Sequence, residues 1–159
     1  MTYTPTDVLN LATAGMTGSE EKTFNYSSLI LNREEMQDKK KYNIALIGAG
    51  RMGARWARVV TASKQASLRL IVDKNADLSE QVAKIHGAAS GTDHRVAFGS
   101  DIDAVFIVTP HKFLYPFAKE ALLAGKHVFV EKPGSRTESE MRDLIRIAKE
   151  KRLTLTVGF

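Results

Sequence analysis

The sequence of 159 residues contains no cysteine. This absence excludes disulfides, thiolate nucleophiles and cysteine-ligated zinc or iron–sulfur sites, and we predict no metal site. Long hydrophobic runs are also missing, since no apolar stretch approaches the roughly 18 to 20 residues that cross a bilayer. The first residues lack the basic-then-apolar order of a secretory signal. We therefore expect a soluble, cytoplasmic protein without a membrane partner.

The sequence also lacks a concentrated charge of one sign. Its 23 basic and 18 acidic side chains give a net charge of +5 and are dispersed along the chain. The longest basic run, Lys39–Lys41, is short. Because no basic stripe or aromatic-interleaved patch accompanies the charge, we expect no nucleic-acid partner. A mildly basic surface suits a cofactor that carries phosphate.

Two regions of the chain differ in pattern. Residues 1–40 mix Thr, Ser, Gly and Glu with only weak helical patches, near 8–14 and 28–36, and we interpret them as an N-terminal extension or linker. Residues 41–159 read as one domain, in which short apolar runs alternate with segments of helical period. This alternation predicts an α/β fold with a parallel sheet and crossover helices. The expected strands are 42–47, 68–72, 104–108, 127–130 and 153–157.

Local patterns sharpen some of these elements. The run Ala104–Val108 has no polar alternation, which predicts a central strand buried on both faces. Residues 87–100 read as a short strand followed by an irregular connection. One helix is indicated by an apolar stripe that ends before Gly125, a residue suited to a left-handed C-terminal cap; the stripe consists of Leu114, Phe117, Ala118, Ala121 and Leu122. A second helix is expected to start with a Thr137/Glu140 capping box and to bury Met141, Leu144, Ile145 and Ala148.

The string Gly48-Ala-Gly50-Arg51-Met52-Gly53 has the form G-x-G-x-x-G. It directly follows the first expected strand and opens a helical segment, which is the context that a dinucleotide-binding turn requires. Gly48 permits a tight turn, Gly50 lets the backbone approach a pyrophosphate, and Gly53 lets the helix pack closely on the strand. The helix N-terminus offers free N–H groups and a positive dipole to the phosphates. A glycine-rich turn without a ligand is the alternative.

An acidic residue, Asp73, closes the second expected strand, 20 positions after Gly53. A carboxylate at this place accepts hydrogen bonds from an adenosine ribose and repels a 2′-phosphate, so NAD is favoured over NADP. The adjacent Lys74 offsets part of that repulsion, which keeps NADP as the alternative cofactor. A solvated turn residue or a helix cap is the other interpretation of Asp73.

A third cluster, Glu131-Lys132-Pro133, comes directly after the strand at 127–130. This position is at the carboxyl edge of the sheet, where open α/β sheets bind their ligands. A lysine here can protonate, or hydrogen-bond to, a substrate oxygen during hydride transfer. The pair Thr109-Pro110 ends the central strand at the same edge and is expected to line the nicotinamide or its ribose. A surface lysine before a turn proline is the alternative to a catalytic Lys132.

These strings together closely resemble the cofactor-binding half of the glucose-fructose oxidoreductase / inositol dehydrogenase (Gfo/Idh/MocA) family. The resemblance covers about residues 41–159 and is carried by the four strings 44–53, 103–110, 121–128 and 130–133. It implies a Rossmann-type, doubly wound, mostly parallel sheet and NAD(P)-dependent oxidation or reduction of a sugar, an inositol or a related hydroxyl or keto carbon. By resemblance, Lys132 takes the place of the active-site lysine, and Glu131, Thr109 and Pro110 fall in the nicotinamide and substrate region.

The sequence departs from the family pattern at two points. After Thr109-Pro110 the family often has an asparagine and, three residues later, a histidine, whereas this sequence has His111 and Leu114. Family members also continue into a second α/β domain that carries most contacts to the small-molecule substrate, and we expect that domain to be missing here.

If that domain is missing, as we expect, more than one function is open. We expect little or no activity from these residues alone. A non-catalytic dinucleotide-binding module or truncated subunit is the alternative function, and an S-adenosylmethionine-dependent methyltransferase leaves Glu131-Lys132-Pro133 unexplained. A homo-oligomer is left open.

Overall fold

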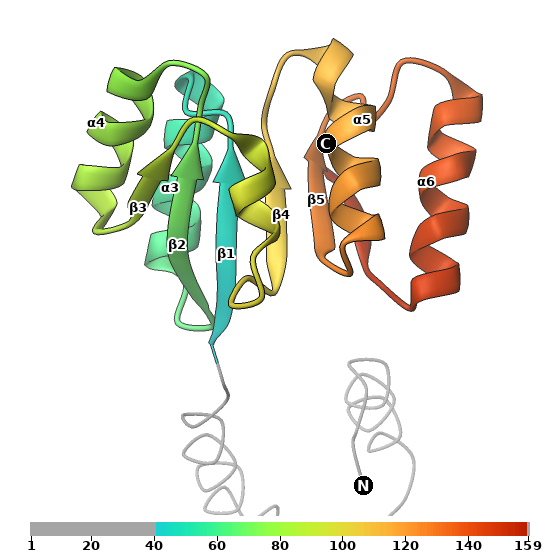
Figure 1. The fold of residues 1–159 in the computed structure, drawn as a ribbon, viewed down its shortest axis with the longest axis horizontal. Helices are drawn as coiled ribbons and strands as arrows, with labels where there is room; N and C mark the ends of the chain where they lie inside the picture. The colour runs from blue at the N-terminus through green and yellow to red at the C-terminus, as the bar shows by residue number, and fades with distance from the viewer. Residues whose placement is uncertain (1–40, 159) are drawn as a thin grey trace, which may run out of the picture. The chain divides into compact units, whose positions relative to one another are not determined.

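The structure, a computed structural model, describes residues 41–158. The extension and helical patches expected in residues 1–40 lie outside the described residues. Six strands form one sheet in the order β3-β2-β1-β4-β5-β6 (Figure 1), and every neighbouring pair is parallel. The strands are β1 (Tyr42–Ile47), β2 (Ala66–Val72), β3 (Ala89–Gly91), β4 (Ala104–Ile107), β5 (His127–Glu131) and β6 (Leu155–Gly158). The predicted Rossmann-type, doubly wound parallel sheet is therefore confirmed.

Helices connect the strands and cover both faces of the sheet. They are α3 (Arg51–Ala62), α4 (Ala76–His86), the 3₁₀ helix η3 (His94–Phe98), α5 (His111–Leu123) and α6 (Glu138–Lys151). Helices α3 and α4 pack with Ile44 and Leu46 of β1, whereas α5 and α6 share a core with Ala45 and Ile47. Because successive strand residues point to opposite faces, the two helix pairs lie on opposite sides of the sheet.

The prediction that the central strand is buried on both faces is only half correct. Val105 and Ile107 are fully buried under α5 and α6, but Ala104 and Phe106, which point the other way, are only half-buried. On that face α3 packs on β1 and β2, and α4 on β2 and β3. On the α3 side Phe106 contacts the ring of Trp56 on α3, with centroids 5.9 Å apart, and still keeps part of its surface exposed.

The helix signals in the sequence place α5 and α6 correctly, with one error. The stripe of α5 is buried at Leu114, Ala118, Ala121 and Leu122, and Gly125 follows it with φ +80°. Thr137 caps α6 by accepting a hydrogen bond from the backbone N–H of Glu140 at 3.2 Å. Ile145 was expected in the core but is 41% exposed, while Ile147 is buried. The buried face of α6 therefore contains Leu144, Ile147 and Ala148, which pack in the core shared with α5.

The strand order reverses direction between β1 and β4. From β1 the chain proceeds through β2 to β3 at one side of the sheet, and then returns to β4, β5 and β6 at the other side. In open α/β sheets the crevice at the carboxyl ends of the strands on either side of such a reversal is the usual ligand site. Among the described helices, none has both the length and the hydropathy of a bilayer span.

Candidate functional site

The turn between β1 and α3 has a backbone that requires glycine at two positions. Gly48 adopts φ +103°, and a Cβ at this residue would overlap the carbonyl oxygen of Val108 on the neighbouring strand connection. Gly53 is buried in the first turn of α3, where a Cβ would overlap the carbonyl oxygen of Gly48. Each glycine therefore allows a close backbone approach that no side chain permits. The two together bring the start of α3 directly over the end of β1.

Gly50 differs from the other two glycines because the space above it is open. It caps α3 with φ −64°, and a Cβ at Gly50 would meet no atom within 4 Å. No side chain caps this helix end, and the first turn contains no acidic residue. Arg51 and Met52 are exposed. The first N–H groups of a helix have no partner within the helix, so α3 presents uncompensated amides and a positive dipole end to this space.

Asp73 lies directly after β2 and is half-buried. Its Oδ2 accepts a hydrogen bond from the backbone N–H of Ala49 at 2.8 Å, and its Oδ1 accepts one from Asn75 at 3.0 Å. The carboxylate thereby joins the glycine turn to the end of β2. A carboxylate has about four lone-pair sites, so both oxygens retain capacity for ligand hydroxyl groups.

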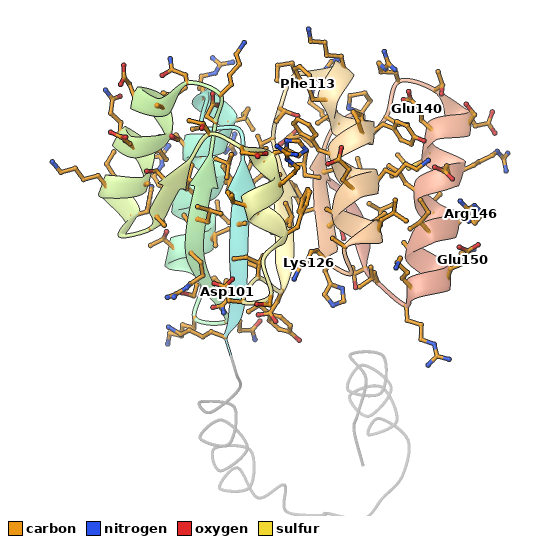
Figure 2. All side chains as sticks on the ribbon, in the orientation of Figure 1. Asp101, Phe113, Lys126, Glu140, Arg146 and Glu150 are labelled. Carbon is orange, nitrogen blue, oxygen red and sulfur yellow. The ribbon has the colours of Figure 1, made fainter. Side chains whose placement is uncertain are left out.

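A pocket with a volume of about 480 Å³ opens beside this turn at the carboxyl edge of the sheet. Figure 2 shows Phe113, one of its wall residues, at the end of the described domain opposite to Asp101 and Lys126. Five of the predicted site residues line the pocket, namely Gly48, Gly50, Asp73, Thr109 and Pro110. The aliphatic and aromatic wall is formed by Ile47, Val72, Val108, Phe113 and Phe117. A mostly apolar cavity of this size with a few polar groups is typical of small-molecule sites.

One polar atom in the pocket wall has no partner. The Thr109 Oγ1 is buried and makes no hydrogen bond to any residue in the 41–158 range. Buried hydroxyl groups in folded proteins are nearly always hydrogen-bonded. Together with the open space above Gly50, this unpaired hydroxyl fits a site built for a ligand with polar groups.

His94 also lines the pocket, and reasoning from the sequence assigned it no role. Its ring stacks on Phe117 with centroids 4.1 Å apart, and its Nε2 lies 2.8 Å from Oε2 of Glu120. Hydrogen bonds from the Arg95 side chain and backbone lower the pKa of the neighbouring Asp93 to about 2. His94 lies in η3, where no local periodicity marks a residue as buried or exposed, so no pattern in the sequence could have placed it beside α5.

Glu131 and Lys132 lie at the end of β5, outside the residues that line the pocket. Glu131 Oε1 accepts a hydrogen bond from the indole Nε1 of Trp56 on α3 at 2.8 Å. The Lys132 side chain is exposed and has no hydrogen bond or ion pair with the residues that the structure describes, and the peptide bond from Lys132 to Pro133 is cis. No contact with the described residues therefore holds the lysine amine.

The two departures from the family pattern have different structural settings. His111 is the first residue of α5 and is exposed, and it does not line the pocket. Leu114 is fully buried in the core beneath α5. A side chain at position 114 therefore points into the protein, where leucine packs without a polar partner.

The reversed strand order, the glycine turn at its centre and the acidic residue after β2 define a dinucleotide-binding Rossmann domain. Residues 42–159 match the family described as "Oxidoreductase family, NAD-binding Rossmann fold" (GFO_IDH_MocA). The chain belongs to this Gfo/Idh/MocA family, and the predicted resemblance is confirmed.

Known relatives agree with this assignment. Inositol 2-dehydrogenase of Rhizobium meliloti (strain 1021) is 31% identical over 114 residues, which cover 72% of this chain and 34% of the relative. UDP-N-acetylglucosamine 3-dehydrogenase of Acidithiobacillus ferrooxidans is 34% identical over 115 residues, with 71% and 35% covered. The crystal structure of GenD2 from gentamicin A biosynthesis in complex with NAD has a TM-score of 0.73 and 30% identity, and the match covers 75% of this chain and 34% of GenD2. The matches thus span about a third of the length of each of these relatives.

Proposed function

We propose that this chain is the cofactor-binding part of an NAD(P)-dependent oxidoreductase acting on a sugar, an inositol or a related hydroxyl or keto compound. The observation that carries the proposal is the open space above Gly50, where uncapped amides of α3 face the point of strand-order reversal. The family match and the relatives that act on inositol or a nucleotide sugar support the reaction and substrate class.

In the proposed binding mode the cofactor lies along the carboxyl ends of the strands. The pyrophosphate lies over the β1 end, against Gly50 and the backbone amides of Arg51 and Met52. The adenosine half extends toward β2, where the Asp73 carboxylate accepts hydrogen bonds from the ribose hydroxyls and the apolar pocket holds the base. The negative charge of Asp73 disfavours a 2′-phosphate, so the proposed cofactor is NAD, with NADP as the alternative that Lys74 leaves open.

The other half of the cofactor extends over β4 and β5, toward Thr109, Pro110, Glu131 and Lys132. The unpaired Thr109 hydroxyl is available to a polar group of the bound cofactor. When bound, the nicotinamide supplies the site that accepts or donates hydride. Lys132, exposed at the end of β5, transfers the proton. During oxidation the lysine amine accepts a proton from the substrate hydroxyl, and during reduction the lysine ammonium donates a proton to the carbonyl oxygen.

The rate of hydride transfer tests the proposed role of Lys132. This rate is measured from the absorbance of the reduced nicotinamide. The assay offers NAD and a panel of inositols and sugars to the protein that carries this chain. Lys132→Ala is expected to lower turnover by roughly 10²- to 10⁴-fold, because a positioned acid–base group contributes that factor, while NADH affinity stays nearly unchanged. The matched control is Lys149→Ala, an exposed lysine on α6, which should leave turnover unaltered.

Two results would contradict parts of the proposal. Full turnover in Lys132→Ala would remove this lysine from the mechanism. NADH binding without hydride transfer to any compound in the panel would favour the alternative function, a non-catalytic dinucleotide-binding module.

A further inference from the structure

The only tryptophan of the chain connects the helix of the glycine turn to the end of β5. Trp56 lies on α3, five residues after Arg51, and its Nε1 donates a hydrogen bond to Glu131 Oε1 at 2.8 Å. The two residues are 75 positions apart in the sequence. This hydrogen bond therefore links the helix whose start is proposed to bind the phosphates to the turn that contains Lys132.

Aromatic rings fix the position of the Trp56 indole. Its centroid lies 4.5 Å from that of Phe129 on β5 and 5.9 Å from that of Phe106 on β4. Phe106 and Phe129 stack on each other with centroids 4.7 Å apart. A ring held by two neighbours has few rotamers available, so its N–H direction is set by packing before any ligand arrives.

The Glu131 carboxylate has a second contact on its other oxygen. Glu131 Oε2 accepts a hydrogen bond from the backbone N–H of Lys132 at 3.1 Å. One carboxylate thus bridges the indole of α3 and the first amide of the turn that contains the lysine. Hydrogen bonds to an ionised carboxylate are stronger than those between neutral groups, which makes this bridge suited to hold the turn.

We propose that Trp56 is a positioning residue for the Glu131-Lys132 turn. By holding Glu131 against α3, it fixes the start of the lysine turn relative to the helix N-terminus that binds the cofactor phosphates. The inference rests on the proposed function, since it assumes that the nicotinamide half of the cofactor lies over β4 and β5. An indole that contributes only to core packing would not distinguish one half of the cofactor from the other.

This distinction can be measured with two ligands. NADH and ADP-ribose share the adenosine and pyrophosphate parts, and only NADH carries the nicotinamide. Trp56→Phe keeps an aromatic ring against Phe129 but removes the N–H donor. We expect this substitution to weaken NADH about tenfold more than ADP-ribose, which corresponds to one lost hydrogen bond to a charged group. Calorimetry gives both affinities without using tryptophan fluorescence.

A double-mutant cycle tests whether Trp56 acts through Glu131. In a Glu131→Leu background the indole has no acceptor, so adding Trp56→Phe should change the NADH to ADP-ribose affinity ratio by less than about twofold. The control is Val82→Ala, which truncates a buried side chain of α4 in the core that Trp56 packs against. This control should lower thermal stability and leave the affinity ratio unchanged.

A measurement on the unaltered side chain covers the case in which Trp56→Phe does not fold. A single tryptophan gives a single indole N–H signal in a nitrogen–proton NMR spectrum. Glu131→Gln should move this signal upfield, because a neutral amide is a weaker acceptor than a carboxylate. Saturating NADH should shift it, while ADP-ribose should not.

The possible outcomes separate this inference from the proposed function. If the wild-type chain binds neither ligand, the proposed function and the role of Trp56 are both overturned. If both ligands bind, but Trp56→Phe weakens them equally or not at all, only the role of Trp56 is overturned. Equal shifts of the indole signal with NADH and ADP-ribose lead to the same conclusion.

Discussion

A methyl group added at Gly50 should lower the affinity for the cofactor, whereas one added at Gly87 should lower the stability of the fold. A Cβ built at either residue meets no atom within 4 Å. Gly50 has φ −64°, which alanine adopts readily, whereas Gly87 follows α4 in the left-handed region with φ +66°. Gly50→Ala therefore fills space above the proposed phosphate site, while Gly87→Ala strains the backbone at the end of α4 that lies away from that site.

The expected magnitudes follow from these conformations. At Gly87 the left-handed conformation costs alanine about 1 to 2 kcal/mol, which lowers the unfolding temperature of a domain of this size by roughly 4 to 8 °C. At Gly50 the smaller entropy of the unfolded chain stabilises by about 0.4 to 1 kcal/mol, and the weaker helix cap of alanine costs about 0.5 to 1 kcal/mol. The unfolding free energy of Gly50→Ala should thus stay within about 0.5 kcal/mol of the wild-type value.

Calorimetric titration with NADH and thermal unfolding without cofactor measure the two effects separately. Gly50→Ala should bind NADH at least about tenfold more weakly, a loss of about 1.4 kcal/mol, at nearly unchanged stability. Gly87→Ala should lose stability and keep the wild-type affinity. The reasoning fails if Gly50→Ala binds NADH as tightly as the wild type, or if Gly87→Ala loses affinity to the same degree.

Three other substitutions test separate features. Asp73→Asn keeps an acceptor for the Ala49 amide but removes the charge, so NADPH affinity should rise about tenfold relative to NADH; an unchanged ratio in paired titrations would argue against the ribose role. Lys126 is only 8% exposed, and its amine donates hydrogen bonds to two backbone carbonyls at 2.7 and 2.8 Å. Lys126→Met should therefore lower the unfolding free energy by about 2 to 3 kcal/mol in denaturant titrations. A loss below about 0.5 kcal/mol would refute the stabilising role of these hydrogen bonds. The cations of Lys119 and Arg146 hold the pKa of Asp143 well below its usual range, so its stabilisation is complete above about pH 4 and lost at lower pH. Thermal unfolding should therefore be less acid-sensitive in Asp143→Asn, and identical pH profiles would contradict this.

Much of the fold could be predicted because it is encoded locally. Apolar runs separated by helical stripes give the parallel sheet, and the glycine string after the first run places the turn between β1 and α3. The positions of Asp73 and Lys132 at strand ends then follow from topology alone, because parallel strands present their carboxyl ends at one edge of the sheet.

The contacts between distant elements could not be predicted in this way. A tryptophan on a helix reads as a core residue, and nothing in its spacing indicates a hydrogen bond to Glu131 across 75 positions. His94 joins the pocket wall through contacts of its own side chain with Phe117 and Glu120 of α5, and no periodic signal in η3 indicates these contacts. Ile145 belongs to the expected apolar stripe of α6 but is exposed, whereas Ile147 is buried, because packing against α5 and not the local spacing selects the buried face.

A crystal structure of the chain with bound NADH tests the central claim most directly. The account predicts that pyrophosphate oxygens lie about 2.7 to 3.2 Å from backbone nitrogens at the start of α3, next to Gly50, with the adenosine ribose against Asp73. A nucleotide bound at another edge of the sheet, or a glycine turn left empty at saturating NADH, would contradict it.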